Sequence, residues 1–274
     1  MDYSGLVIAA IVGTALVAGL IANKYVRPFA KSEVQGVKLE ALVGPIVSLT
    51  VLLIAFTLVT VFASFQRGQT AAADEARKVD NQFETAQYLK EPQRQEVLSA
   101  TTCYALAVST YEWEAMADGR TASEVSPWTK AIRAGYADMV AADDVPSGVM
   151  SALLAADRDR AEARSKRLTE ARPAVPNELK FLLVLSASLG ILALGTFTLG
   201  YVSRRVQIGV LSILALVFVL FLAAISDMDR PYDGLIAAPP DDITRVAGEL
   251  YEDYQEMYPE QALPCDETGR ALTA

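Results

Sequence analysis

Four long stretches of the chain contain only apolar and uncharged polar residues, with no Asp, Glu, Lys or Arg in any of them. About 20 such residues in a helix span the hydrocarbon core of a bilayer, because each residue adds about 1.5 Å. Four stretches of this length in one chain are typical of an integral membrane protein. We therefore predict four transmembrane helices, at residues 5–22, 41–65, 181–202 and 208–225.

The segment between the second and third stretches predicts helices outside the membrane. Apolar residues recur at intervals of three and four from Val97 to Ala115, which marks one helical face. Pro92, Pro127 and Pro146 fall where helices are expected to begin. We found no convincing alternation typical of a strand. The sequence predicts an all-α protein with a first transmembrane hairpin at 1–65, an extramembrane helical bundle at 66–180, a second hairpin at 181–225 and an acidic tail at 226–274.

The tail holds an excess of acidic residues equal to the net charge of the whole chain, which is −9. One of its segments has an apolar stripe at helical spacing, so we predict a short amphipathic helix. Its polar face is acidic and would be repelled by anionic lipid headgroups. We expect the helix to pack on the bundle through Ile243, Val246, Leu250, Tyr254 and Met257.

Both short connecting loops are basic. Residues 23–40 hold four basic and two acidic side chains, and Arg204 and Arg205 join the third and fourth stretches. Short basic loops stay in the cytoplasm, which puts the N-terminus, the bundle and the tail outside. Residues 1–4 contain no base, unlike a signal peptide, so we expect the first helix to be retained. The basic residues of 160–180, close to the third stretch, favour the opposite orientation and keep that alternative open.

The chain has two cysteines, Cys103 in the predicted bundle and Cys265 in the tail. Two membrane crossings separate them, so they lie on the same side of the membrane in either orientation. In an oxidising compartment they could form a disulfide that holds the tail to the bundle. Two unrelated cysteines remain an equal alternative, because spacing along the chain does not establish geometry.

The composition excludes several function classes. The chain has no histidine, which removes Ser-His-Asp triads, Cys-His dyads and His-ligated zinc or haem. Two cysteines cannot ligate a Cys₄ zinc or iron–sulfur site. Nucleic acid is not an expected partner, because phosphate binding needs clustered positive charge. We expect a protein without enzymatic activity and without a cofactor.

One polar stripe is a candidate pore lining. Thr50, Thr57 and Ser64 are seven residues apart on the second predicted helix, and Thr60 is adjacent on the helical wheel. In an oligomer such stripes could surround a pore and replace part of an ion's hydration shell. The alternative is that the hydroxyls bond to carbonyls of their own helix or join neighbouring helices, which is their general use in membranes.

Three further groups have both a functional and a structural interpretation. Asp227, Asp229 and Asp233 could form a weak Ca²⁺ site, but without an EF-hand loop a solvated turn is the simpler interpretation. The basic run at 158–172 is mixed with acids and is typical of a solvated, salt-bridged face, with an anion-collecting rim as the alternative. The small-residue pair Ala15 and Gly19, with others like it, indicates close helix packing.

Several short motifs together resemble one family. They are Ala55-Phe56-Thr57, Asp74-Glu75-Ala76, Glu91-Pro92, Glu112-Trp113, and Asp229-Arg230-Pro231 followed by Gly234. In this order, over roughly residues 45–240, they resemble the bacterial bestrophin-like domain family. The resemblance implies a multi-pass protein of the bacterial plasma membrane. It also suggests kinship to bestrophins, pentameric anion channels whose second helix lines the pore. Their helical domain is cytosolic, whereas the charge pattern here places the bundle outside.

Two functions are therefore expected. The first is a bestrophin-like homo-oligomeric channel in the lipid bilayer, with an anion pore lined by the second transmembrane helix. The alternative is a non-conducting accessory or structural subunit of a larger envelope or respiratory membrane complex.

Overall fold

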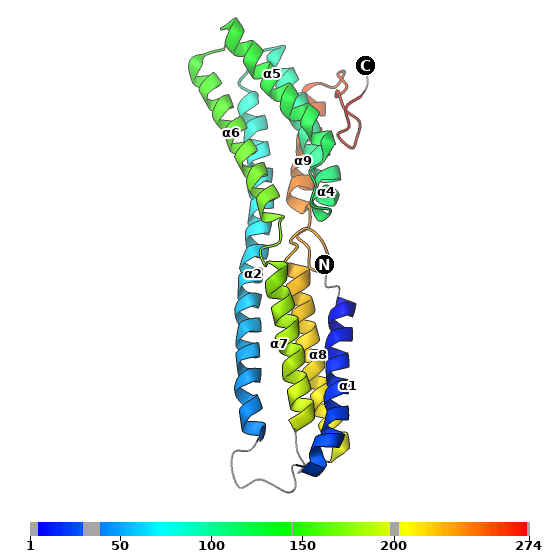
Figure 1. The fold of residues 1–274 in the computed structure, drawn as a ribbon. Coiled ribbons are helices and arrows are strands. Elements are labelled where there is room, and N and C mark those ends of the chain that lie inside the picture. The colour runs from blue at the N-terminus through cyan, green and yellow to red at the C-terminus, as the bar shows by residue number, and fades with distance from the viewer. Residues whose placement is uncertain (1–4, 30–38, 144, 198–202, 273–274) are drawn as a thin grey trace. The chain divides into compact units, whose positions relative to one another are not determined.

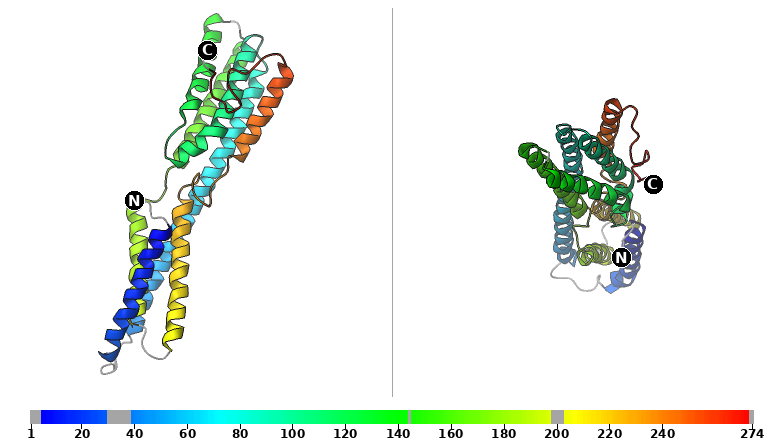
Figure 2. Two further views of the ribbon diagram at one scale, coloured as in Figure 1. Left: turned by 90° about the vertical axis from the view of Figure 1, so that its right-hand side faces the viewer. Right: turned by 90° about the horizontal axis from the view of Figure 1, so that it is seen from above.

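The protein is described by a computed structural model that covers residues 5–29, 39–143, 145–197 and 203–272. Within these ranges the regular structure is helical, with one isolated bridge between Cys265 and Ala271 (Figures 1 and 2). The predicted all-α class is confirmed. The helices are α1 (Gly5–Phe29), α2 (Leu39–Ala86), α3 (Gln93–Ala107), the π-helix η1 (Val108–Glu112), α4 (Trp113–Ala117), the 3₁₀ turn η2 (Ser123–Val125), α5 (Ser126–Ala142), α6 (Ser147–Glu170), α7 (Asn177–Phe197), α8 (Arg204–Met228) and α9 (Asp241–Met257).

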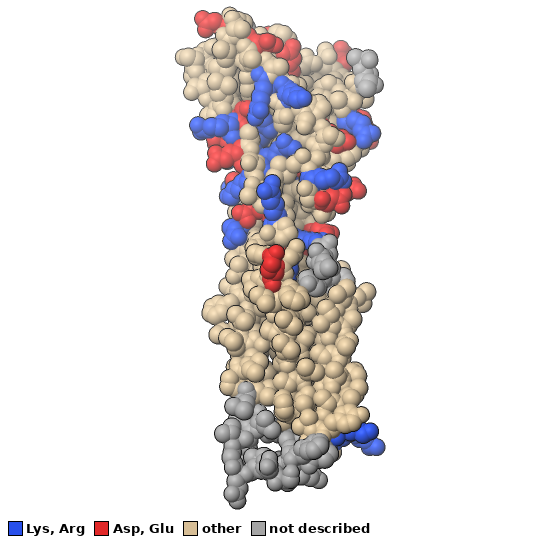
Figure 3. Space-filling model, in the orientation of Figure 1, with Lys and Arg blue, Asp and Glu red and all other residues tan. Residues whose placement is uncertain are grey.

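The chain divides into two compact units. The membrane unit comprises residues 1–64 and 173–229, and the bundle unit comprises residues 65–172 and 230–274. Four helices are long and apolar enough to cross a membrane: α1, α2, α7 and α8. This confirms the four predicted spans, except that residues 198–202 of the third lie outside the described residues. On the face drawn in Figure 3, Lys, Arg, Asp and Glu are spread over the bundle helices, whereas the membrane helices are uncharged along most of their length and carry Lys or Arg at one end.

Close backbone contact joins α1 to α7 in the membrane unit. A Cβ atom built on Gly19 would lie 2.7 Å from the carbonyl oxygen of Leu192, and one built on Gly195 would lie 3.1 Å from the backbone of Gly19. The Asn23 amide also donates to the carbonyl of Thr196 over 2.7 Å. Glycine is therefore needed where the two helices meet. Such small-residue contacts replace the hydrophobic effect as a source of helix association in lipid.

The bundle unit is built around one apolar core. The face predicted from Val97 onward is buried, including Val97 and Tyr104, and α5 contributes Trp128 and Ile132 to the same core. The part of α2 beyond its apolar stretch contributes Val79 and Phe83 among others.

The tail helix α9 packs on the bundle core as expected. Ile243, Val246, Leu250 and Tyr254 are buried in that core, together with Ala247. Met257 was also expected on this face, but it is exposed because it is the last residue of α9, where the helix ends.

Replacement of Gly19 by Ala is expected to lower the melting temperature of the purified protein in detergent. The new methyl group would overlap the backbone of α7, and overpacking of this kind costs about 1–3 kcal/mol. Gly13→Ala is the matched control, because a Cβ atom there has no neighbour within 4 Å. Alanine is the better helix former, so the control is expected to melt at or above the wild-type temperature. Equal melting temperatures for the two variants would contradict the close α1–α7 contact.

Candidate functional site

The hydroxyl stripe on α2 faces the interior of the membrane unit. Thr50, Thr57 and Ser64 are buried within the single chain. Thr50 donates to the carbonyl of Ile46 over 3.0 Å, and Thr57 to that of Leu53 over 2.9 Å. Thr60 is exposed and donates to its own helix, to the carbonyl of Phe56. In the described chain, three of the four candidate pore residues therefore do not lie on an outer surface where protomers could meet.

A different face of α2 is exposed. Leu52, Phe56 and Val59 are each at least half exposed. Their spacing of four and three residues places them on one side of the helix, roughly opposite Thr50 and Thr57. Thr60 lies next to Phe56 at the edge of this side. We call Leu52, Phe56, Val59 and Thr60 the outer face of α2.

The proposed metal ligands are not assembled. In the described part of the chain, no three His, Cys, Asp or Glu side chains are grouped to hold a metal ion. Asp229 is buried and forms an ion pair with Lys180 at 2.6 Å. Its other oxygen accepts from the amides of Ala174 and Val175 at 2.9 and 3.0 Å. This carboxylate joins the segment before α7 to the end of α8. Its contacts are those of a structural ion pair and not of a weak Ca²⁺ site.

The remaining two aspartates have separate surroundings. Asp233 pairs with Arg230 at 3.5 Å and accepts from the amide of Gly234 at 2.8 Å. Asp227 lies in the last turn of α8. The turn after α8 is thus an ordinary arrangement of ion pairs and backbone hydrogen bonds.

The two cysteines are joined. Cys103 on α3 and Cys265 in the tail form a disulfide with a Cα–Cα distance of 5.9 Å, and no free cysteine remains. The bond links positions 162 residues apart in the sequence. A disulfide of this kind typically contributes about 2–4 kcal/mol.

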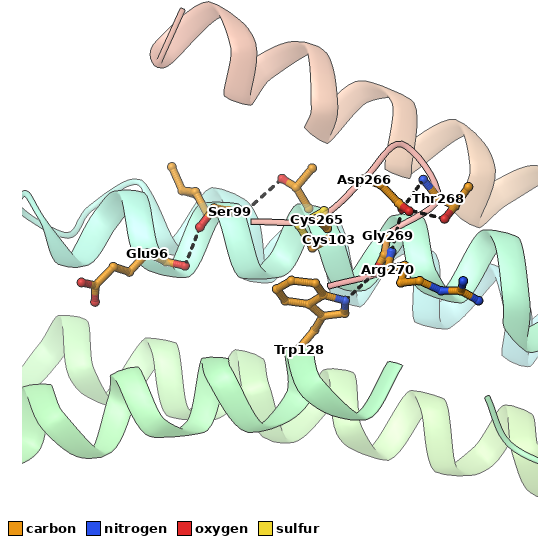
Figure 4. Close-up of a disulfide and its surroundings, with 11 residues drawn as sticks. Glu96, Ser99, Cys103, Trp128, Cys265, Asp266, Thr268, Gly269 and Arg270 are labelled. Atoms are coloured by element: carbon orange, nitrogen blue, oxygen red, sulfur yellow. Dashed lines mark hydrogen bonds between the residues drawn. A yellow bond between two sulfur atoms is a disulfide. The ribbon is translucent and has the colours of Figure 1, made fainter. Parts of the chain in front are cut away.

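The loop that follows Cys265 is fitted closely to the bundle (Figure 4). Asp266 closes the loop by accepting from the amides of Thr268 and Arg270, each at 2.9 Å. Gly269 has a φ of +80°, and a Cβ atom there would lie 2.2 Å from the amide nitrogen of Ala107, so glycine is required. The Trp128 indole donates to the carbonyl of Gly269 over 2.7 Å. The acidic tail is therefore a folded part of the bundle unit.

A buried ionic cluster lies at the centre of the bundle unit. We use this name for Glu75, Tyr104, Glu112, Arg160, Arg164 and Arg167, with Asp157 at its edge. Arg167 is fully buried and donates to Glu75 on α2 and, over 2.5 Å, to Glu112 on η1. Arg164 donates to the same Glu112 carboxylate over 2.5 and 3.2 Å. One carboxylate from α2 and one from η1 therefore meet arginines from α6.

Aromatic side chains complete the cluster. The Tyr104 hydroxyl donates to Glu75 over 2.6 Å. The guanidinium of Arg160 lies 4.5 Å from the centre of the Tyr104 ring and donates to Asp157 over 2.6 Å. The guanidinium of Arg167 lies 4.9 Å from the centre of the Trp113 ring. Such cation–π contacts replace part of the hydration that a buried guanidinium has lost.

Burial and neighbouring charges shift the pKa values of several members of the cluster. Burial alone would raise the pKa of Glu112, but Arg167 and Arg164 lower it below the ordinary value. Burial opposes the charge on Arg167, yet Glu75 and Glu112 raise its pKa further above the ordinary value. Burial and the neighbouring Glu75 raise the pKa of Tyr104, so its hydroxyl stays protonated and can donate. The pair of Glu112 with Arg164 and Arg167 therefore stays ionised and ties η1 to α6.

This cluster corrects the expectation for the basic run at 158–172. Arg160 and Arg167 are fully buried, so these two arginines belong neither to a solvated face nor to an anion-collecting rim, whereas Arg158 and Lys166 of the same run are exposed. The spacing contained the signal, because Arg160 and Arg167 continue the buried stripe of Leu153, Ala156 and Ala163 at intervals of three and four. Glu112 is buried whereas Glu114, two residues further on, is exposed, because residues two apart do not share a helix face.

Four apolar spans, an outer face on α2 and a helical bundle closed by ionic contacts define an all-α membrane protein. The family model of the Bestrophin-like domain matches residues 5–243, and the chain belongs to this family. No curated protein sequence matches the chain.

Solved structures show the same fold. A point variant of a bacterial bestrophin homologue from Klebsiella pneumoniae has 10% identity and a TM-score of 0.67, and the match covers 93% of this chain and 99% of that one. The Klebsiella pneumoniae homologue whose structure was phased on zinc has 9% identity and a TM-score of 0.69, and the match covers 92% of this chain and 98% of that one. A further point variant of this homologue has 9% identity and a TM-score of 0.70, and the match covers 90% of this chain and 98% of that one. At this identity the likeness establishes the fold alone.

Replacement of Arg167 by Met is expected to destabilise the bundle by about 3–5 kcal/mol, because loss of one partner of a buried pair leaves the other charge uncompensated. The measurement is thermal unfolding in detergent, followed by circular dichroism. Arg158→Met is the matched control on the same helix, since Arg158 is exposed and its pair with Asp159 is worth about 0–1 kcal/mol.

Addition of Glu75→Gln to the Arg167→Met variant is expected to recover part of the lost stability, because a neutral amide needs no counter-charge. If the Arg167 variant melts like the Arg158 variant, or the second change gives no recovery, the ionic cluster does not stabilise the bundle in this way.

Proposed function

We propose that the protein is a channel for small anions that acts as a homo-oligomer, with the outer face of α2 lining the conduction path. The observation that carries the proposal is the fold match to a bacterial bestrophin homologue over 93% of this chain and 99% of that one. The family resemblance implies a pore lined by the second transmembrane helix. The outer face of α2 supports this, because its side chains are available to meet the same face of other protomers.

The chemistry of that face suits an apolar constriction. Leu52, Phe56 and Val59 carry no charge and would surround the path with hydrocarbon, which gates ions by excluding water. Thr60 would add one hydroxyl at the edge. A path of this kind has no fixed charge to select anions. Arg204 and Arg205, which are exposed at the start of α8, supply positive charge that would raise the local anion concentration.

The chain offers a clean background for testing the path, because both natural cysteines are bonded and an introduced cysteine is the only free thiol. Val59→Cys, on the outer face of α2, is expected to react with a charged, membrane-impermeant thiol reagent and thereby to change the anion current in planar bilayers. Ile213→Cys on α8 is the matched control, since Ile213 is 65% exposed in the single chain and Val59 is 67% exposed.

Two outcomes would overturn the proposal. If the wild-type protein carries no anion current in bilayers, the non-conducting accessory subunit becomes the better interpretation. If the Val59 and Ile213 variants respond alike to the reagent, α2 does not line the path.

We also propose that the protein lies in the bacterial plasma membrane with its bundle unit outside the cytoplasm. Disulfides persist in oxidising compartments and are rare in the cytosol, so the bond between Cys103 and Cys265 supports this orientation. The short basic connection that contains Arg204 and Arg205 supports it independently, because such loops remain in the cytoplasm.

Orientation is tested with two introduced cysteines at exposed positions, Leu272→Cys in the tail and Ser203→Cys before α8. An impermeant maleimide is expected to label Leu272→Cys in spheroplasts and Ser203→Cys only after lysis. The reverse pattern would place the bundle unit in the cytoplasm. The natural cysteines stay silent in this assay because they are bonded.

A further inference from the structure

The connection between α8 and α9 is a loop whose two ends are held in the bundle unit. The Tyr232 hydroxyl donates to the carbonyl of Gly68 on α2 over 2.7 Å. At the other end, the Ala238 amide donates to the carbonyl of Pro231 over 2.6 Å, and its carbonyl accepts from the Trp113 indole over 3.0 Å. Tyr232 and Ala238 are both buried. Residues 233–237 therefore form a projecting tip on a fixed base.

The tip presents apolar side chains to the surroundings. Leu235 is 97% exposed and Ile236 is 42% exposed. Gly234, just before them, has a φ of +95°, a conformation that glycine adopts without strain. Burying one such side chain is worth about 1.5–3 kcal/mol. A loop with fixed ends that holds a leucine almost fully outside its own fold indicates an apolar environment beyond the chain.

The base of the loop lies near the end of the apolar part of two membrane helices. Pro231 follows Met228, the last residue of α8, by three residues. Gly68, which binds Tyr232, follows Phe65, the last residue of the uncharged stretch in α2, by three residues as well. Phe65 and Gly68 both lie in α2, so at 1.5 Å per residue Gly68 is about 4.5 Å along the helix beyond the uncharged stretch. The headgroup layer on each side of a bilayer is about 5–8 Å thick, so the base of the loop falls at the depth of that layer.

We propose that the tip of this loop inserts Leu235 and Ile236 into the boundary between the headgroups and the acyl chains of the leaflet in which α8 ends. The partner is lipid, and the contact is hydrophobic. The charged groups flanking the tip are acidic or paired: Asp233 with Arg230, and Asp241 and Asp242 at the start of α9. The insertion therefore does not depend on anionic lipid. The inference does not depend on whether the protein conducts ions.

The test uses Leu235→Cys in the full-length chain, labelled with an environment-sensitive fluorophore through its one free thiol. The protein is reconstituted in phosphatidylcholine vesicles that contain lipid with a nitroxide near the top of the acyl chain. A blue-shifted spectrum and loss of most of the fluorescence to this quencher are expected. Leu154→Cys is the matched control, because Leu154 is also exposed. It lies about 24 Å along α6 from Glu170. Glu170 pairs with Arg67, the residue before Gly68 at the base of the loop, so Leu154 is far from that base.

Three results would overturn the proposal. In the first, the label at Leu235 is quenched by aqueous iodide and not by the nitroxide lipid, which places the tip in water. In the second, neither quencher reaches it, which places it against another protein or a second copy of the chain. In the third, the labels at Leu235 and Leu154 are quenched equally by the lipid, so the tip has no particular contact with the bilayer.

Discussion

The bundle unit depends on the burial of Arg167 between Glu75 and Glu112. A guanidinium in the interior costs several kcal/mol of lost hydration, and two carboxylates, the face of Trp113 and the sulfur of Met116 replace that hydration. Each partner comes from a different part of the chain, and each must be placed correctly for the burial to be tolerated. Such a contact adds little net stability over an apolar core of the same volume. It does make other registers of α6 against α2 unfavourable, since they would leave a charge unpaired.

The membrane unit is held together by the opposite means. Charge is absent from its apolar spans, and α1 and α7 approach until their backbones touch at Gly19 and Gly195. In lipid there is no hydrophobic gain in bringing two apolar helices together, so short-range packing and hydrogen bonds such as Asn23 to Thr196 carry the association. The ion pair of Lys180 and Asp229 agrees with the absence of charge from the spans, because it lies at their ends, where α7 begins and α8 ends.

The sequence predicted the elements well and the tertiary contacts poorly. The four spans, the buried face of α3 and the docking of α9 follow from local patterns of apolar residues. The ionic cluster joins residues far apart in the chain, as Glu75 and Arg167 show, and no local pattern reveals such partners. The stripe of Thr50 and Thr57 was recognised as one face of α2, but a stripe does not say which neighbour it faces. Both residues are directed into the membrane unit, where hydroxyls that bond their own helix are compatible with apolar packing.

The shared fold leaves the orientation in the membrane undetermined, because a four-span protein has the same helical packing in either direction. Two separate features of this chain bear on it. Cytosolic thiols are kept reduced, so the bond between Cys103 and Cys265 is unfavourable on that side. The bond is not incidental to the tail, since Gly269 and Trp128 hold the loop that follows it against α3 and α5. The second feature, the basic pair Arg204 and Arg205, lies on the short connection between α7 and α8. Insertion of the helices into the membrane and thiol chemistry are unrelated processes, so these two features are independent support for the proposed external bundle, while the basic residues before α7 favour the opposite orientation.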